Sequence, residues 1–226
     1  MAIKFTIINT IALCNYNFID YLFVMNITEE TVADYIAKIL TRRIVTGEMG
    51  PGQKLRQDYI AQEFGASHVP VREAFRRLES RGLVVSEPRR GVRVSSFNKE
   101  DIAEIIEMRS TLEALALRHA IPHITPLIID KAEQWIRKGD AATQVTEWEE
   151  ANRQFHLTIL MPCKMPRLLR TIEDLHIMSS RHLFAGWRAD WDIATDRDHR
   201  AIVNALRAKR GELAAQTLAQ HVKRSG

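Results

Sequence analysis

Four side chains in the second half of the chain could together bind a divalent metal ion. Asn152 and His156 lie four residues apart, which puts them on one face of a helix, and His199 and His221 follow on two later predicted helices. An amide oxygen with three imidazoles suits zinc, nickel, iron or manganese. The spacing leaves an alternative open, because a lone buried histidine is more often satisfied by a backbone carbonyl than by a metal.

A second group of side chains, in the first half, could bind the phosphates of nucleic acid. Between Ser67 and Val94 there are seven arginines and three glutamates, so this segment alone carries the +4 excess of the whole chain. Phosphate neutralisation gives sequence-independent affinity for DNA, and arginine suits this role. The alternative is that these arginines only solvate a helix face.

The sequence around these arginines predicts a helix-turn-helix. Residues 58–64 are amphipathic at helical spacing, with Tyr59, Ile60 and Phe64 on the apolar side, and Gly65 interrupts the pattern. A second helix is expected to start at Ser67, a good N-cap, with a proline tolerated in its first turn. Its apolar positions repeat at helical spacing, at Val71, Phe75 and Leu78. Two helices joined by a tight glycine-containing turn form a unit whose second helix can enter a major groove.

Two short strands are predicted after the second helix. Residues 83–85 and 92–94 are rich in β-branched side chains, and Arg89 and Arg90 lie between them. This pattern is typical of a wing, a hairpin that here carries two arginines at its tip. An amphipathic helix that begins at Thr28 is expected to support the unit, with an apolar stripe at Val32, Ile36, Ile39, Leu40 and Ile44. Because helix, turn, wing and charge coincide, DNA binding is favoured over simple solvation.

From residue 98 onward the pattern changes to helices alone. Asn98 can cap a helix, so we place a domain junction there. Proline and glycine divide the rest into about six helices, at 99–120, 126–138, 144–161, 166–185, 190–209 and 211–223. The expected fold class is mainly α, with an N-terminal winged helix-turn-helix (residues 26–97) and a C-terminal antiparallel all-α bundle (residues 98–226).

Length and composition narrow the remaining possibilities. The chain has 226 residues, enough for one or two domains, and 46% hydrophobic with 27% charged residues is typical of a globular protein. Cys14 and Cys163 form no CxxC pattern, which indicates a reducing compartment, so we expect a cytoplasmic protein. Residues 1–25 are apolar but interrupted by polar side chains, so we expect an extension of unknown role and no membrane partner.

Residues 28–97 resemble the DNA-binding domain of the GntR family of bacterial transcription regulators. The family's motifs are present in order as Pro51-Gly52 with Leu55, Gly65 with Ser67, Pro70 to Phe75 with Leu78, Gly82-Leu83-Val84 and Arg89-Arg90-Gly91. The resemblance assigns DNA contacts to Ser67, His68, Val69 and Arg72 on the second helix and to Arg89 and Arg90 on the wing. The chain departs from the family at His68 and Asp58, where arginine is common, and these departures leave the operator sequence open.

Residues 99–222 resemble the FCD ligand-binding domain of the FadR subfamily. The matching elements are Arg109 with Leu112-Glu113, Asn152 with Phe155-His156, His199 with Ile202 and Ala205-Leu206, and Gly211-Glu212 with Ala215 and His221. The resemblance implies that Asn152, His156, His199 and His221 hold a divalent metal, with an amide in place of an aspartate at the first position. It places Arg109 to pair with the carboxylate of a small organic acid effector. The alternative for Arg109 is a surface ion pair with Glu107 or Glu113.

The resemblance implies a regulator and not an enzyme. We expect a homodimer that binds a palindromic operator in double-stranded DNA, as a repressor that a small carboxylate metabolite controls. One alternative is an effector domain without metal, in which the histidines bind an organic acid directly. The other is a metal-dependent hydrolase with Asp198 or Glu150 as its base, although no hydrolase motif accompanies these side chains.

Overall fold

The structure is a computed structural model that describes residues 31–96, 98–186 and 197–224. Three expectations lie outside these residues: the extension at 1–25, the helix start at Thr28, and the first turns of the helix expected at 190–209.

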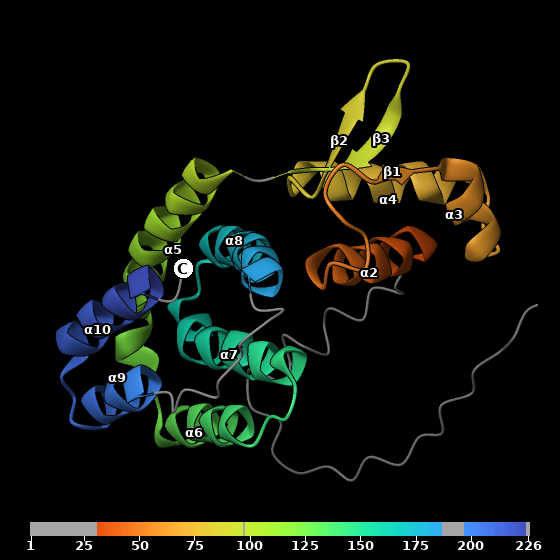
Figure 1. Ribbon diagram of the computed structural model, residues 1–226. Helices are drawn as coiled ribbons and strands as arrows, with labels where there is room; N and C mark the ends of the chain where they lie inside the picture. The colour runs from red at the N-terminus through yellow and green to blue at the C-terminus, as the bar shows by residue number, and fades with distance from the viewer. Residues whose placement is uncertain (1–30, 97, 187–196, 225–226) are drawn as a thin grey trace, which may run out of the picture.

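The first part of the chain folds into three helices and a small sheet (Figure 1). The elements are α2 (Val32–Val45), β1 (Lys54–Leu55), α3 (Gln57–Glu63), α4 (His68–Ser80), β2 (Val84–Glu87) and β3 (Gly91–Val94). The strands form one antiparallel sheet in the order β1-β3-β2. The helices α3 and α4 form the helix-turn-helix, and β2 and β3 form a wing that projects beyond α4.

Local sequence explains most of these elements. Thr31 and Asp34 form a capping box at the start of α2, and Ser67 occupies the N-cap position of α4. The apolar stripe of α4 is buried as predicted, at Val71, Phe75 and Leu78. Two expectations were wrong, because Val32 and Tyr59 point to solvent. Strand β1 was not predicted, since two residues carry no periodicity.

The second part is a helical bundle, which confirms the predicted fold class. Its helices are α5 (Lys99–Ala120), α6 (Pro126–Asp140), α7 (Val145–Leu160), α8 (Pro166–Gly186), α9 (Arg197–Arg207) and α10 (Gly211–Arg224), with 3-10 turns at Ile121–His123 and Met161–Cys163. Figure 1 shows α8 between α5 and the helices of the first part, and α8 packs against both α5 and α2. None of the described helices has the length and apolar run that crossing a bilayer requires.

The core of the bundle lies where α5, α7, α9 and α10 meet. Large apolar side chains from these helices are fully buried there, among them Leu117, Phe155, Ile202 and Leu218. Burial of such side chains stabilises a fold by about 1.5–3 kcal/mol each. This apolar shell surrounds a small set of buried polar side chains, which include four histidines.

Candidate metal centre and nucleic-acid interface

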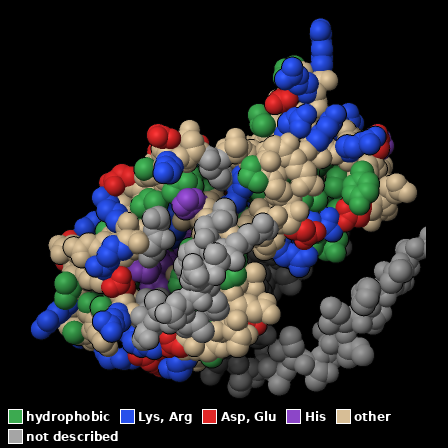
Figure 2. All heavy atoms as spheres, in the orientation of Figure 1, with side chains coloured by type: hydrophobic (Ala, Val, Ile, Leu, Met, Phe, Trp, Pro, Cys, Tyr) green, Lys and Arg blue, Asp and Glu red, His purple; other side chains and the backbone are tan. Residues whose placement is uncertain are grey.

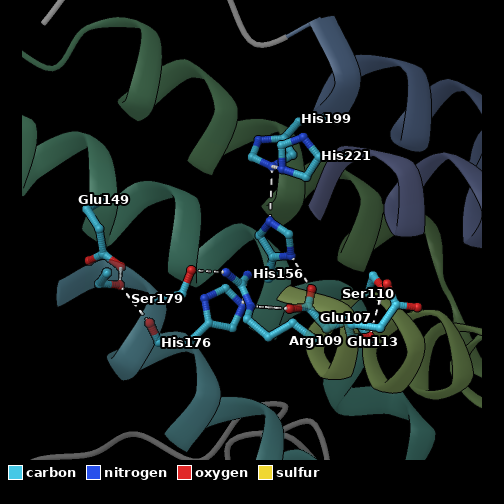
Figure 3. A network of polar contacts seen from close by, with 11 residues as sticks. Glu107, Arg109, Ser110, Glu113, Glu149, His156, His176, Ser179, His199 and His221 are labelled. Carbon is cyan, nitrogen blue, oxygen red and sulfur yellow. Dashed lines mark hydrogen bonds and ion pairs between the residues drawn. The ribbon is translucent and has the colours of Figure 1, made fainter. Parts of the chain in front are cut away.

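Three imidazoles from three helices converge in the middle of the bundle (Figure 3). His156 of α7, His199 of α9 and His221 of α10 are all buried. The Nε2 atom of His199 lies 3.2 Å from Nε2 of His156 and 3.0 Å from Nε2 of His221. The ring of His199 stacks on Phe155, with centroids 3.9 Å apart, and this contact fixes its orientation.

Carboxylates on the far side of two of these rings determine which nitrogen carries a proton. His156 Nδ1 lies 2.6 Å from Glu113 Oε2, and His221 Nδ1 lies 3.3 Å from Asp198 Oδ2. A carboxylate accepts hydrogen bonds, so each Nδ1 donates and each Nε2 keeps its lone pair. Burial lowers the pKa of His156 despite Glu113, which keeps this imidazole neutral.

Two lone pairs therefore face His199 Nε2, which can donate one proton at most. A proton on this nitrogen can be donated to only one of the two neighbouring Nε2 atoms at a time. A cation between the three nitrogens would satisfy all of them. Nitrogens about 2.1 Å from one metal are about 3.0 Å apart when the bonds meet at right angles. The observed separations of 3.0 and 3.2 Å match this geometry.

A small cavity beside the histidines carries the other polar atoms that fit a metal centre. Asn152 and His199 line it, and its volume of about 10 Å³ has room for about one water molecule. Asn152 Oδ1 is buried without a hydrogen-bond partner in the described structure, and so is Trp135 Nε1, whose residue lines the same cavity. An orphaned amide oxygen on the same helix as His156, in a residue that lines the same cavity as His199, is suitable as a fourth ligand, and the indole N–H is a second unsatisfied polar group among the lining residues.

Glu113 connects the histidine cluster to a buried arginine. Its Oε1 accepts from Arg109 Nε at 2.9 Å, while its Oε2 accepts from His156. Burial alone would raise the pKa of Glu113, but Arg109, His156 and His176 outweigh it and hold this pKa well below its ordinary value. Burial and the nearby Arg109 lower the pKa of His176 to about 3, so this ring is neutral.

Arg109 itself has three internal partners. Besides Glu113, its Nη1 donates to Ser179 Oγ at 2.9 Å and its Nη2 lies 2.9 Å from His176 Nε2. The ion pair with Glu113 that the sequence offered as an alternative is present, but it is buried and not on the surface. The structure thus gives Arg109 a supporting position next to the histidine cluster.

Several members of this network escaped sequence reasoning. The sequence indicated Glu113 as an ion-pair partner of Arg109 and Asp198 as a possible base, but neither as a partner of metal-ligating histidines, and it gave no specific role to His176. The adjacency of Asp198 to His199 and the spacing of Glu113 four residues after Arg109 were the available signals. Nothing in the spacing of His176 indicates that it meets Arg109, since this contact joins residues 67 positions apart.

The expected DNA-contacting side chains lie together on an exposed face. Those on α4 are Ser67, His68, Val69 and Arg72, and those on the turn between β2 and β3 are Arg89 and Arg90; all six are exposed. Figure 2 shows Lys and Arg side chains gathered on the wing and the adjoining face of this part of the molecule. Among the described residues, neither Arg72 nor the two wing arginines form an ion pair, so these charges are available to phosphates.

Two contacts position the start of α4. Gln57 Nε2 donates to the backbone oxygen of His68 at 3.0 Å, which ties α3 to the first turn of α4. The Ser67 side chain makes no capping hydrogen bond, so its hydroxyl is not used by the helix. His68 Nε2 lies 3.6 Å from Asp58 Oδ1, so the two residues that depart from the family motif are neighbours.

Comparison with known proteins extends over both parts of the chain. Residues 32–94 match the family described as "Bacterial regulatory proteins, gntR family", and residues 104–224 match the FCD domain. A probable D-xylose utilization operon transcriptional repressor of Paenarthrobacter nicotinovorans is 32% identical over 205 residues, covering 87% of this chain and 88% of that protein. The repressor RspR of Escherichia coli (strain K12) is 26% identical over 204 residues, covering 86% and 87%.

Solved structures give the same assignment. The structure of E. coli McbR/YncC superposes with a TM-score of 0.75 at 26% identity, covering 86% of this chain and 94% of that one. A putative GntR regulator from Rhodococcus shares the fold, with a TM-score of 0.69 at 23% identity. With an exposed basic helix-turn-helix joined to an FCD domain, the chain belongs to the GntR family and is a DNA-binding transcriptional regulator.

Proposed function

We propose that this regulator binds its operator under the control of a divalent metal ion and a small carboxylate effector in the helical bundle. The observation that carries this proposal is the convergence of three buried Nε2 atoms, two of which keep lone pairs because carboxylates hold the opposite Nδ1. His156, His199, His221 and Asn152 would hold the ion. When bound, it would supply a positive centre to which an effector carboxylate can bind.

Within this proposal Arg109 stabilises the metal centre through Glu113, and it is not the sole binding group for the effector carboxylate. Its guanidinium neutralises Glu113 and orients it toward His156. Since three nitrogens of Arg109 already have internal partners, an effector carboxylate would have to displace Ser179 or His176 to reach it. The cavity beside Asn152 and Trp135 offers a position for one effector oxygen or one water, with the indole N–H as a donor.

We further propose the division of the chain into an extension (residues 1–25), a DNA-binding domain (26–97) and an effector domain (98–226) of the FadR type. Ser67, His68, Val69 and Arg72 would read the major groove, and Arg89 and Arg90 would contact backbone or minor groove from the wing. A homodimer on a palindromic operator fits a helix-turn-helix protein, because the two-fold symmetry of one matches that of the other. Repression is the mode of action that the names of two related regulators support, and we propose that this regulator acts in the cytoplasm.

Metal analysis of the full chain, purified without chelators, tests the metal centre. We expect about one equivalent of a first-row divalent metal per chain by mass spectrometry, and calorimetric zinc binding that His156→Ala abolishes. His119→Ala is the matched control, because His119 is exposed on α5 and should leave binding unchanged. Wild-type protein that binds zinc no better than His156→Ala would contradict the metal centre and favour an effector domain without metal.

A further inference from the structure

Helix α8 presents two different stripes of side chains to the two parts of the molecule. The stripe toward the bundle is Ile172, Leu175, His176 and Ser179, and the stripe toward the DNA-binding part is Asp174, Ile177, Met178 and Arg181. Each set follows the spacing i, i+3, i+4 and i+7 of one helix face. Helix α8 therefore contacts the bundle and the DNA-binding part over the same stretch of its length.

On the bundle side, α8 is bonded to the network that supports the candidate metal centre (Figure 3). His176 and Ser179 contact two nitrogens of the Arg109 guanidinium. The third contact of Arg109 is Glu113, which accepts from His156. His156 is thus connected to α8 through two buried charged groups, without a solvent-exposed step.

On the opposite side, Arg181 binds the junction between the recognition helix and the wing. Its guanidinium donates to Ser95 Oγ at 2.8 Å and to the backbone oxygen of Ser95, and its side chain is 5% exposed. Ser95 directly follows β3, and its Oγ donates to the backbone oxygen of Gly82 at 2.6 Å. Gly82 lies just beyond α4, so one serine joins the end of α4 to the base of the wing, and Arg181 holds that serine.

Three neighbouring contacts make this attachment firm. Asp174 forms an ion pair with Arg81 at 3.2 Å, at the end of α4. Ile177 packs against the apolar core of the DNA-binding part. The Met178 side chain lies against Gly82, whose φ of +69° belongs to the left-handed region and whose missing Cβ leaves room for it. Both DNA-reading elements are therefore fixed to α8 at their common base.

We propose that Arg181 is a positioning residue that sets the orientation of the recognition helix and wing according to the state of the metal centre. This inference deepens the proposed function and rests on it. A cation bound by His156 acts first on Glu113 and Arg109, which are buried, so solvent screens the added charge only weakly. If Arg109 is displaced, its hydrogen bonds to His176 and Ser179 displace helix α8 with it. The hydrogen bonds of Arg181 then transmit the displacement of α8 to Ser95.

The test compares operator affinity with and without zinc for the full chain and an Arg181→Leu variant. The probe is a labelled duplex selected for binding from random DNA, and zinc is added to chelator-treated protein. We expect the wild-type Kd to change by about 5–150-fold on zinc addition, the usual range for coupled sites, and the variant Kd to change less than about twofold. Arg167→Leu, an exposed arginine of the same helix, should respond as the wild type does.

Other readouts separate positioning from mere stability. Calorimetric zinc affinity should be unchanged in Arg181→Leu, because the hydrogen bonds of Arg181 to Ser95 lie on the side of α8 that faces the DNA-binding part and not the histidine cluster. Arg181→Lys, which keeps the charge but reaches fewer acceptors, should give an intermediate response if the leucine variant does not fold. An Arg181→Leu variant that folds and responds to zinc like the wild type overturns the inference and leaves the proposed function intact.

A wild type that binds the duplex but ignores zinc contradicts the proposed function, and a distance measurement then decides the inference. Spin labels at Arg90 and Gln134, with Cys14→Ser and Cys163→Ala, report the position of the wing relative to the bundle. We expect one narrow distance distribution in the wild type and a broader one in Arg181→Leu. Identical distributions would overturn the positioning role.

Discussion

Replacing Glu113 by glutamine is the strongest test of the buried network that Glu113 forms with Arg109 and His156. The substitution keeps the shape of the side chain and removes its charge. Glu113 is fully buried and accepts from Arg109 Nε at 2.9 Å and from His156 Nδ1 at 2.6 Å. In Glu113→Gln the guanidinium of Arg109, itself 8% exposed, stays buried without a carboxylate.

Two losses follow from this geometry. Breaking a buried ion pair by removing one partner costs about 3–5 kcal/mol. At about 2–4 °C per kcal/mol for a chain of this size, the melting temperature of the metal-free protein should fall by roughly 6–20 °C. Loss of the partner that orients a metal-ligating histidine should also weaken zinc binding by about 10–100-fold.

Scanning calorimetry and zinc titration measure the two effects separately. The matched control is Glu212→Gln, which removes a carboxylate from an exposed ion pair with Arg118 and should change little because solvent screens this pair. The pKa of Glu113 is lowered in the folded state, so its contribution is present at neutral pH and is lost as pH falls through that pKa. Wild type and variant should therefore converge in acid. A Glu113→Gln variant with wild-type melting temperature and zinc affinity would refute the assignment.

Three further predictions address other parts of the molecule. Asn152→Asp should tighten zinc binding in calorimetry, because a carboxylate adds a negative charge at the position of the orphaned amide oxygen; unchanged affinity would remove Asn152 from the ligand set. Arg89→Ala and Arg90→Ala should each weaken binding to all duplexes similarly and reduce the slope of log K against log salt by about 1; a change confined to one sequence would instead indicate base reading. Burial raises the pKa of Glu149 despite a hydrogen bond from Ser180, so the stability of the folded state falls as pH rises from the ordinary carboxylate pKa to the raised one. The Glu149→Gln variant should therefore have a higher melting temperature than the wild type at neutral pH. A lower melting temperature would contradict this.

Local sequence signals predicted the DNA-binding part well. The cap position at Ser67, the glycine break and the stripe of Val71, Phe75 and Leu78 are short-range features, and helix α4 follows them. Predictions failed where burial depends on the tertiary partner. Tyr59 continues an amphipathic pattern but is 63% exposed, because α3 is only seven residues long and buries Ile60 and Ala61.

The site in the bundle was predictable as a set of residue types but not as a network. Helical spacing placed Asn152 and His156 on one face, two later predicted helices offered His199 and His221, and the family resemblance joined all four into one metal site. The partners that decide protonation are separated from these histidines by 43 and 23 residues, so spacing carries no information about them. Similarly, Arg109 has the charge for an effector site, but only the fold shows that Glu113, Ser179 and His176 already occupy its donors.

Fluorescence anisotropy with the full chain tests the central claim most directly. A duplex selected from random DNA and an unselected duplex of equal length are titrated at about 150 mM salt, near physiological ionic strength. An exposed reading helix with a basic wing predicts that the selected duplex binds at least about 10³-fold more tightly, and that Arg72→Ala removes most of this preference. Equal affinity for both duplexes, or a preference that survives Arg72→Ala unchanged, would contradict the account.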